Sequence, residues 1–186
     1  MSGVITATIV PVTAVLLSSA ACLTDVRTGR IPNWLTLPAL CLGLLMHGIL
    51  AGRAGIIESL LGLLAGAAVP AILYRSTQGQ AIGGGDIKLF AALGALLGPM
   101  RGLEVQLGAF GALALFAIVA LAYRGQLLRV LLNTVQLATN PLLPRKWRHP
   151  VSTASMTEFR MGPAIAVAVI ANSCLAYFHR LVPWLG

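Results

Sequence analysis

The chain has 186 residues, of which 58% are hydrophobic and only 10% are charged. Soluble domains carry about 25% charged residues, so this composition excludes an ordinary soluble domain. The apolar runs are long and lack strand-like alternation, and helices rather than a β-barrel are therefore expected to satisfy the backbone inside a membrane. We predict an all-α integral membrane protein that forms a single domain over residues 1–186.

The formal charge is +8, from 13 Lys and Arg residues against 5 Asp and Glu residues. No basic run is interleaved with aromatic residues, so the charge predicts membrane orientation and lipid contact, and no nucleic-acid partner. The cysteines Cys22, Cys41 and Cys174 are isolated in apolar segments. Without a CxxC pair we predict no metal site, and we expect no cofactor.

Residues 4–23 carry no charge and are long enough to form a first transmembrane helix. A cleaved signal peptide is the alternative, but the positively charged start of such a signal is missing. Further apolar helices are predicted at about residues 32–50, 56–74, 89–100, 105–123 and 161–178, with short turns at 52–55 and 101–104. The sequence therefore predicts a bundle of six transmembrane helices.

The fourth apolar run, residues 89–100, is short for a membrane span. Its length as a helix is about 18 Å, against a hydrocarbon core of about 30 Å. Either the helix extends back through Asp86 and Lys88, or the bilayer and protein are locally thin there. Both alternatives place Asp86 near a water-accessible notch rather than on a lipid-facing surface.

Residues 124–160 form the longest polar stretch of the chain. Polar side chains recur in it at spacings of three and four, namely Gln126, Arg129, Asn133, Gln136 and Asn140. This pattern predicts an amphipathic helix on the membrane surface over about residues 124–140, followed by a basic loop over residues 141–160.

Six spans divide the basic residues unequally between the two sides of the membrane. Ten of the 13 Lys and Arg residues fall on one side and three on the other. Loops rich in Lys and Arg remain in the cytoplasm. We therefore expect an inner-membrane protein with both termini outward and with Asp25 and Asp86 on the cytoplasmic side.

Asp25 and Asp86 are the only aspartates of the chain, and each lies at the edge of an apolar run. An ionisable residue at such a place is a functional candidate, because desolvating its charge is costly. Two carboxyls that meet there would share one proton, and such a pair can activate water for peptide hydrolysis without a metal. The structural alternatives are a helix cap for Asp86 and an ion pair with Arg27 or Arg30 for Asp25.

Gly83 and Gly85 precede Asp86 and lack side chains that would block an approaching peptide. The same glycines allow the chain to bend before the helix begins. Lys88 lies two residues after Asp86 and so points to a different helix face. Its ammonium either serves the site or extends to the lipid headgroups.

Two segments resemble the aspartate motifs of type IV prepilin peptidases. The first is Asp25 with Ile31-Pro32-Asn33 downstream, and the second is Gly83-Gly84-Gly85-Asp86-Ile87-Lys88, which is similar to the GxGDxK motif. The GxGD element is also shared with presenilin-type intramembrane aspartyl proteases. The resemblance covers the whole chain and includes Gly162-Pro163-Ala164 at the start of the last helix.

The resemblance implies an aspartic endopeptidase that removes the basic leader peptide from prepilins or pseudopilins at the cytoplasmic face. It implies that Asp25 and Asp86 are catalytic, and that Gly83, Gly85 and Lys88 shape the site or bind substrate. Larger family members also methylate the new amino terminus and carry a region with paired cysteines. This sequence does not contain that region and resembles the short members linked to Flp-type pili, so methyltransferase activity is not expected. The alternative is a non-enzymatic transport or pilus-assembly subunit whose aspartates bind an ion or proton.

Overall fold

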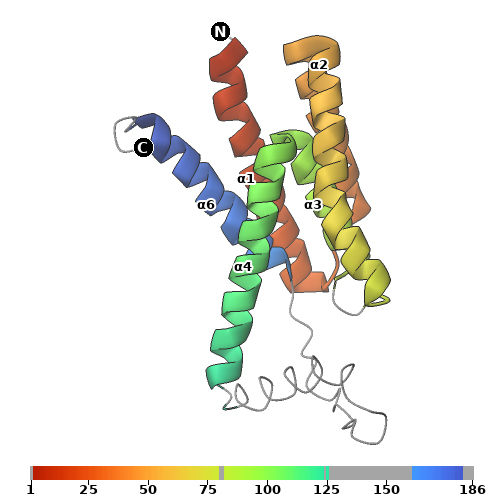
Figure 1. The fold of residues 1–186 in the computed structure, drawn as a ribbon, viewed down its shortest axis with the longest axis vertical. Coiled ribbons are helices and arrows are strands. Elements are labelled where there is room, and N and C mark those ends of the chain that lie inside the picture. The colour runs from red at the N-terminus through yellow and green to blue at the C-terminus, as the bar shows by residue number, and fades with distance from the viewer. Residues whose placement is uncertain (1, 80–81, 124, 126–160, 182–186) are drawn as a thin grey trace, which may run out of the picture. The chain divides into compact units, whose positions relative to one another are not determined.

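The computed structural model describes residues 2–79, 82–123, 125 and 161–181. Over these residues the chain is helical, without strands, and comprises α1 (Ser2–Thr28), α2 (Asn33–Ser76), α3 (Gly84–Leu97), α4 (Pro99–Tyr123) and α6 (Met161–Leu181) (Figure 1). The amphipathic helix predicted at residues 124–140 and the basic loop predicted at 141–160 lie outside the described residues. The helical class of the prediction is confirmed.

The chain divides into two compact units. The first comprises residues 1–112 and 160–186, and the second comprises residues 113–159. All residues of the site described below belong to the first unit. Of the second unit the structure describes the end of α4 and residue 125.

Three stretches of the described helices are long and apolar enough to cross a membrane. They are Ile9–Thr28, Asn33–Ser76 and Pro99–Tyr123. The 44-residue α2 contains two of the predicted helices, because Gly52 has non-helical φ and ψ angles of 60° and −137°. Figure 1 shows α2 turning back there, with its two halves side by side. These helices fit a multi-pass membrane protein, and the number of six spans stays a prediction.

α3 extends back from the short fourth apolar run and includes Asp86 and Lys88. It begins at Gly84, so Asp86 and Lys88 lie within its first turns. It ends at Leu97, where Gly98 has a φ of 80°, and α4 begins at Pro99. The turn predicted at residues 101–104 was therefore wrong, and the chain turns at Gly98 instead. Glycine adopts the left-handed conformation at low cost, and proline is favoured in the first turn of a helix.

α3 is buried between the two halves of α2. All residues from Leu89 to Leu96 are buried. A Cβ atom on Gly43, in the first half of α2, would lie 2.8 Å from the carbonyl carbon of Ala95. In the second half, a Cβ atom on Gly62 or Gly66 would come even closer to the backbone of α3. Small residues allow such close packing, so most of this short helix contacts protein.

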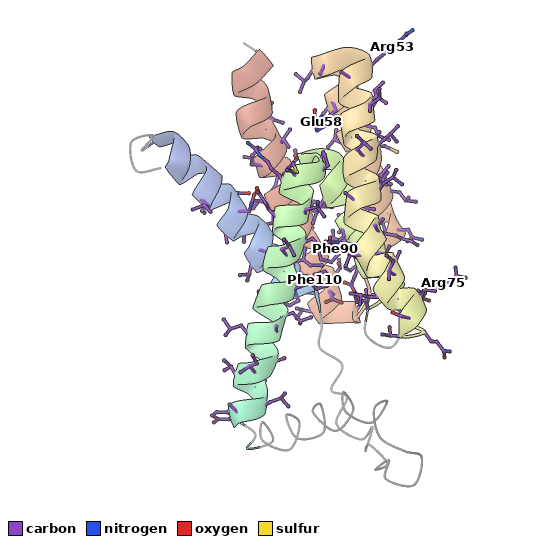
Figure 2. The ribbon with its side chains drawn as sticks, in the orientation of Figure 1. Arg53, Glu58, Arg75, Phe90 and Phe110 are labelled. Carbon is purple, nitrogen blue, oxygen red and sulfur yellow. The ribbon has the colours of Figure 1, made fainter. Side chains whose placement is uncertain are left out.

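Polar side chains of α2 hydrogen-bond the carbonyl groups near the end of α3. The Ser59 hydroxyl donates to the carbonyl oxygen of Ala95 at 2.8 Å, and His47 Nε2 lies 3.0 Å from that of Leu96. Unpaired polar groups are costly in an apolar interior, so these bonds hold α3 at a fixed position along α2. Phe90 and Phe110 point toward each other with ring centroids 5.7 Å apart (Figure 2), which joins α3 to α4.

Candidate active site

Asp25 lies in the last turn of α1, which continues beyond residue 23, where the predicted first helix ends. The helix continues to Thr28 because Gly29, with a φ of 67°, provides the left-handed residue that ends it. The Gly29 N–H donates to the Asp25 carbonyl oxygen at 2.8 Å. The Asp25 side chain is therefore carried by a rigid element, and the residue is only 7% exposed.

The segment after α1 passes directly over the start of α3. Ile31 is buried there. A Cβ atom on Gly85 would lie 3.1 Å from Ile31 Cβ and 3.3 Å from the Ile31 carbonyl oxygen. The missing side chain of Gly85 thus lets the two segments touch, whereas a Cβ on Gly84 would meet nothing within 4 Å. This contact brings the two aspartate-bearing segments together.

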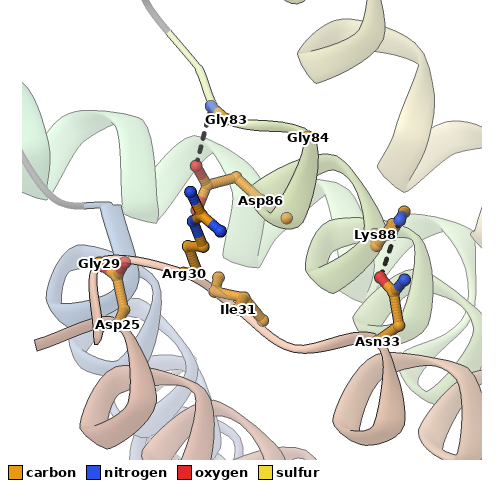
Figure 3. Close-up of a pocket in the computed structure, with 10 residues that line it drawn as sticks. Asp25, Gly29, Arg30, Ile31, Asn33, Gly83, Gly84, Asp86 and Lys88 are labelled. Atoms are coloured by element: carbon orange, nitrogen blue, oxygen red, sulfur yellow. Dashed lines mark hydrogen bonds between the residues drawn. The ribbon is translucent and has the colours of Figure 1, made fainter. Parts of the chain in front are cut away.

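Asp25 and Asp86 line one open pocket of ≈ 340 Å³ (Figure 3). The pocket is formed by the end of α1, the segment that follows it and the first turns of α3. Its lining residues are Asp25, Gly29, Arg30, Ile31, Asn33, Gly83, Gly84, Gly85, Asp86 and Lys88. Every residue that the sequence singled out for the site therefore borders this one pocket.

Asp86 is half-buried and accepts a hydrogen bond from the Gly83 N–H at 3.1 Å through Oδ2. This bond caps α3, so Asp86 does have the structural role that was weighed as an alternative. The pKa of Asp86 is nevertheless raised from 3.8 to about 6, chiefly by burial and to a smaller extent by the charge of Asp25, against the lowering effect of the Gly83 bond. Asp86 is thus a carboxyl that retains its proton to unusually high pH.

Asp25 has a different environment, created by the start of α6. Its Oδ2 accepts a buried hydrogen bond from the Gly162 N–H at 3.0 Å. Each carboxyl thus accepts one backbone N–H. Asp86 accepts it from the glycine three residues before it in the chain, whereas Asp25 accepts it from a different helix.

Lys88 borders the pocket and is held by a residue of the first motif. Its Nζ donates to Asn33 Oδ1 at 2.8 Å, and both side chains are exposed (Figure 3). Asn33 and Gly162 are the partners that sequence reasoning did not place in the site. Both stand in motifs that were recognised, but linear spacing gave no sign of their contacts with Lys88 and Asp25.

The pocket offers carboxyl chemistry. Among residues that the structure describes, no group of three His, Cys, Asp or Glu side chains could hold a metal ion. Two carboxyls that border one pocket, as those of Asp25 and Asp86 do, can together take a proton from water and give one to a carbonyl oxygen.

Comparison with known proteins gives one match. Residues 12–128 match the family model described as the type IV leader peptidase family. This range includes both aspartates and the whole lining of the pocket. Neither the curated proteins nor the solved structures gave a match. Since the family model covers more than half of the chain, the protein belongs to the type IV leader peptidase family.

Proposed function

We propose that this protein is a membrane aspartic endopeptidase that removes the basic leader peptide from prepilin-like substrates. The observation that carries the proposal is that Asp25 and Asp86 border the same pocket. They are the only two aspartates of the chain, and they lie 61 positions apart in the sequence, on α1 and α3. Membership of a leader peptidase family supports hydrolysis of a peptide bond.

The proposed reaction assigns one role to each carboxyl. Asp25, which accepts the Gly162 hydrogen bond, takes a proton from water as the water oxygen attacks the scissile carbonyl carbon. Asp86, whose pKa is raised to about 6, is the protonated member and donates to the carbonyl oxygen. When the tetrahedral intermediate collapses and the C–N bond breaks, Asp25 gives the proton it took from water to the leaving amine, and Asp86 takes back a proton from a hydroxyl of the intermediate as the new carboxyl group forms. No cofactor is required.

The proposed setting follows from the charge distribution. In the predicted six-span topology the pocket shares its side with ten of the 13 basic residues, which supports cleavage at the cytoplasmic face of the inner membrane with both termini outward. Gly83 gives the leader access to the backbone, and Gly85 shapes the site through its contact with Ile31. Lys88 borders the pocket in which the leader binds. Membrane lipid surrounds the bundle, and Flp-type prepilins are the proposed substrate class.

A leader-cleavage assay tests this function. Purified full-length protein in lipid is mixed with a prepilin peptide that carries a basic leader, and the products are identified by mass spectrometry. One cut at the leader junction is expected from the wild type, and none from Asp25→Asn or Asp86→Asn protein that still accumulates in the membrane. Cleavage by either variant, or no cleavage of several pilin classes by folded wild type, contradicts the proposal. In the second case, aspartate-dependent ion flux in vesicles would support the transport alternative.

A further inference from the structure

The start of α6 lies directly against the side chain of Asp25. The Gly162 N–H donates to Asp25 Oδ2 at 3.0 Å, in a contact that is buried. A Cβ atom on Gly162 would lie 2.7 Å from that oxygen, 2.8 Å from Asp25 Cβ and 3.1 Å from Asp25 Cγ. Real Cβ atoms almost never come so close, so only glycine allows the backbone of α6 to reach the carboxylate at this place.

The hydrogen bond is well suited to a carboxylate. The first N–H groups of a helix have no partner within the helix and carry its positive dipole end. Gly162 is followed by Pro163, which has no N–H. The Gly162 amide is therefore a donor of the first turn that an acceptor from outside α6 must satisfy, and Asp25 of α1 is that acceptor.

We propose that Gly162 is a positioning residue of the peptidase, whose backbone amide holds the Asp25 carboxylate in the orientation that activates water. The inference rests on the proposed function and assigns a catalytic purpose to the packing of α6 on α1. Arg30, Asp86 and Lys88 are the other charged groups that border the pocket with Asp25. They come from the loop after α1 and from α3, so a change at Gly162 leaves them in place.

The structural alternative is that Asp25 caps α6 and that the bond serves stability alone. Two variants separate the alternatives. Gly162→Ala adds a methyl group against Asp25, whereas incorporation of glycolic acid at position 162 replaces the N–H by an ester oxygen and adds no atoms. Gly111→Ala in α4 is the matched control, because its Cβ would meet nothing within 4 Å and Gly111 does not border the pocket.

The experiment measures kcat, KM and the pH profile of leader cleavage for full-length protein in lipid, together with thermal unfolding. The ester variant is expected to lose about tenfold in kcat with little change in KM, as loss of one hydrogen bond to a charged group predicts. Gly162→Ala should show the same changes, and Gly111→Ala should match the wild type.

If the ester variant keeps the wild-type kcat, the inference is overturned, whether or not its unfolding temperature is lower. The proposed function stays intact in that case. The ester variant carries this test even where Gly162→Ala does not fold. Folded wild type that cleaves no prepilin peptide overturns the proposed function, and the catalytic purpose of Gly162 with it.

Discussion

Gly62 of α2 and Gly94 of α3 lie back to back, so that a Cβ atom on either one would overlap the carbonyl oxygen of the other. The two helices approach through their backbones at this point, and the α3 residues from Leu89 to Leu96 are buried as a result. The position of α3 against α2, and therefore the position of Asp86, depends on this contact.

Gly62→Ala is expected to force α2 and α3 apart. Overpacking a close contact costs about 1–3 kcal/mol of unfolding free energy, and occasionally more. The expected result is a lower midpoint of thermal unfolding in detergent and reduced leader cleavage. Gly111→Ala places the same methyl group where nothing lies within 4 Å and serves as the control. Equal unfolding midpoints for the two variants would contradict the packing described here.

Leader cleavage is expected to decline as the pH rises through about 6. Burial raises the pKa of Asp86 to about 6, so its carboxyl is protonated below that pH and ionised above it. If Asp86 is the proton donor, kcat/KM is highest on the acid side and falls by about tenfold per pH unit well above the pKa. Rates at peptide concentrations well below KM, measured from about pH 5 to about pH 8, check this. A rate that increases over this range would exclude Asp86 as the donor.

Asp86→Asn is expected to remove activity without lowering stability near neutral pH. A raised pKa means that the ionised carboxyl is less favourable in the folded than in the unfolded chain, so this group reduces stability above about pH 6 and not below its ordinary value of 3.8. Asparagine carries no charge, and its Oδ1 can still accept the Gly83 N–H.

The measurement is the unfolding temperature of wild type and Asp86→Asn as a function of pH. Above about pH 6 the variant should unfold at an equal or slightly higher temperature, and the difference should shrink as the pH falls. A variant that is less stable at neutral pH would show that the capping role of Asp86 outweighs the cost of burying its charge.

The Lys88–Asn33 hydrogen bond allows a double-mutant cycle. Lys88→Met and Asn33→Ala each remove the 2.8 Å bond between the starts of α3 and α2. Because both side chains are exposed, stability should change by less than about 1 kcal/mol. If the bond positions Lys88 in the pocket, each change reduces cleavage, and the double variant is no worse than either single one. If Lys88 only extends to the lipid headgroups, Asn33→Ala leaves cleavage unaltered.

The sequence alone determined the class of the protein and its candidate residues. Long apolar runs can satisfy their backbone in a membrane only as helices, so the helical fold followed from composition and pattern. The rarity of aspartate made Asp25 and Asp86 stand out, and their motifs agree with the family that the comparison found. The turn at Gly52 was also predicted, but other helix ends were not, since Gly29 and Gly98 act through left-handed backbone angles that composition does not reveal.

Only the tertiary structure decided which residues meet. A missing Cβ lets Gly85 fit against Ile31 and lets Gly162 fit against the Asp25 side chain. A sequence does not say which glycines are used in this way. The different surroundings of the two carboxyls arise from the same contacts. Asp86 is desolvated at the start of α3 and accepts an N–H from nearby Gly83, whereas the buried Asp25 accepts one from Gly162, 137 positions away in the sequence. Such long-range hydrogen bonds and burial are properties of packing, and linear spacing does not encode them.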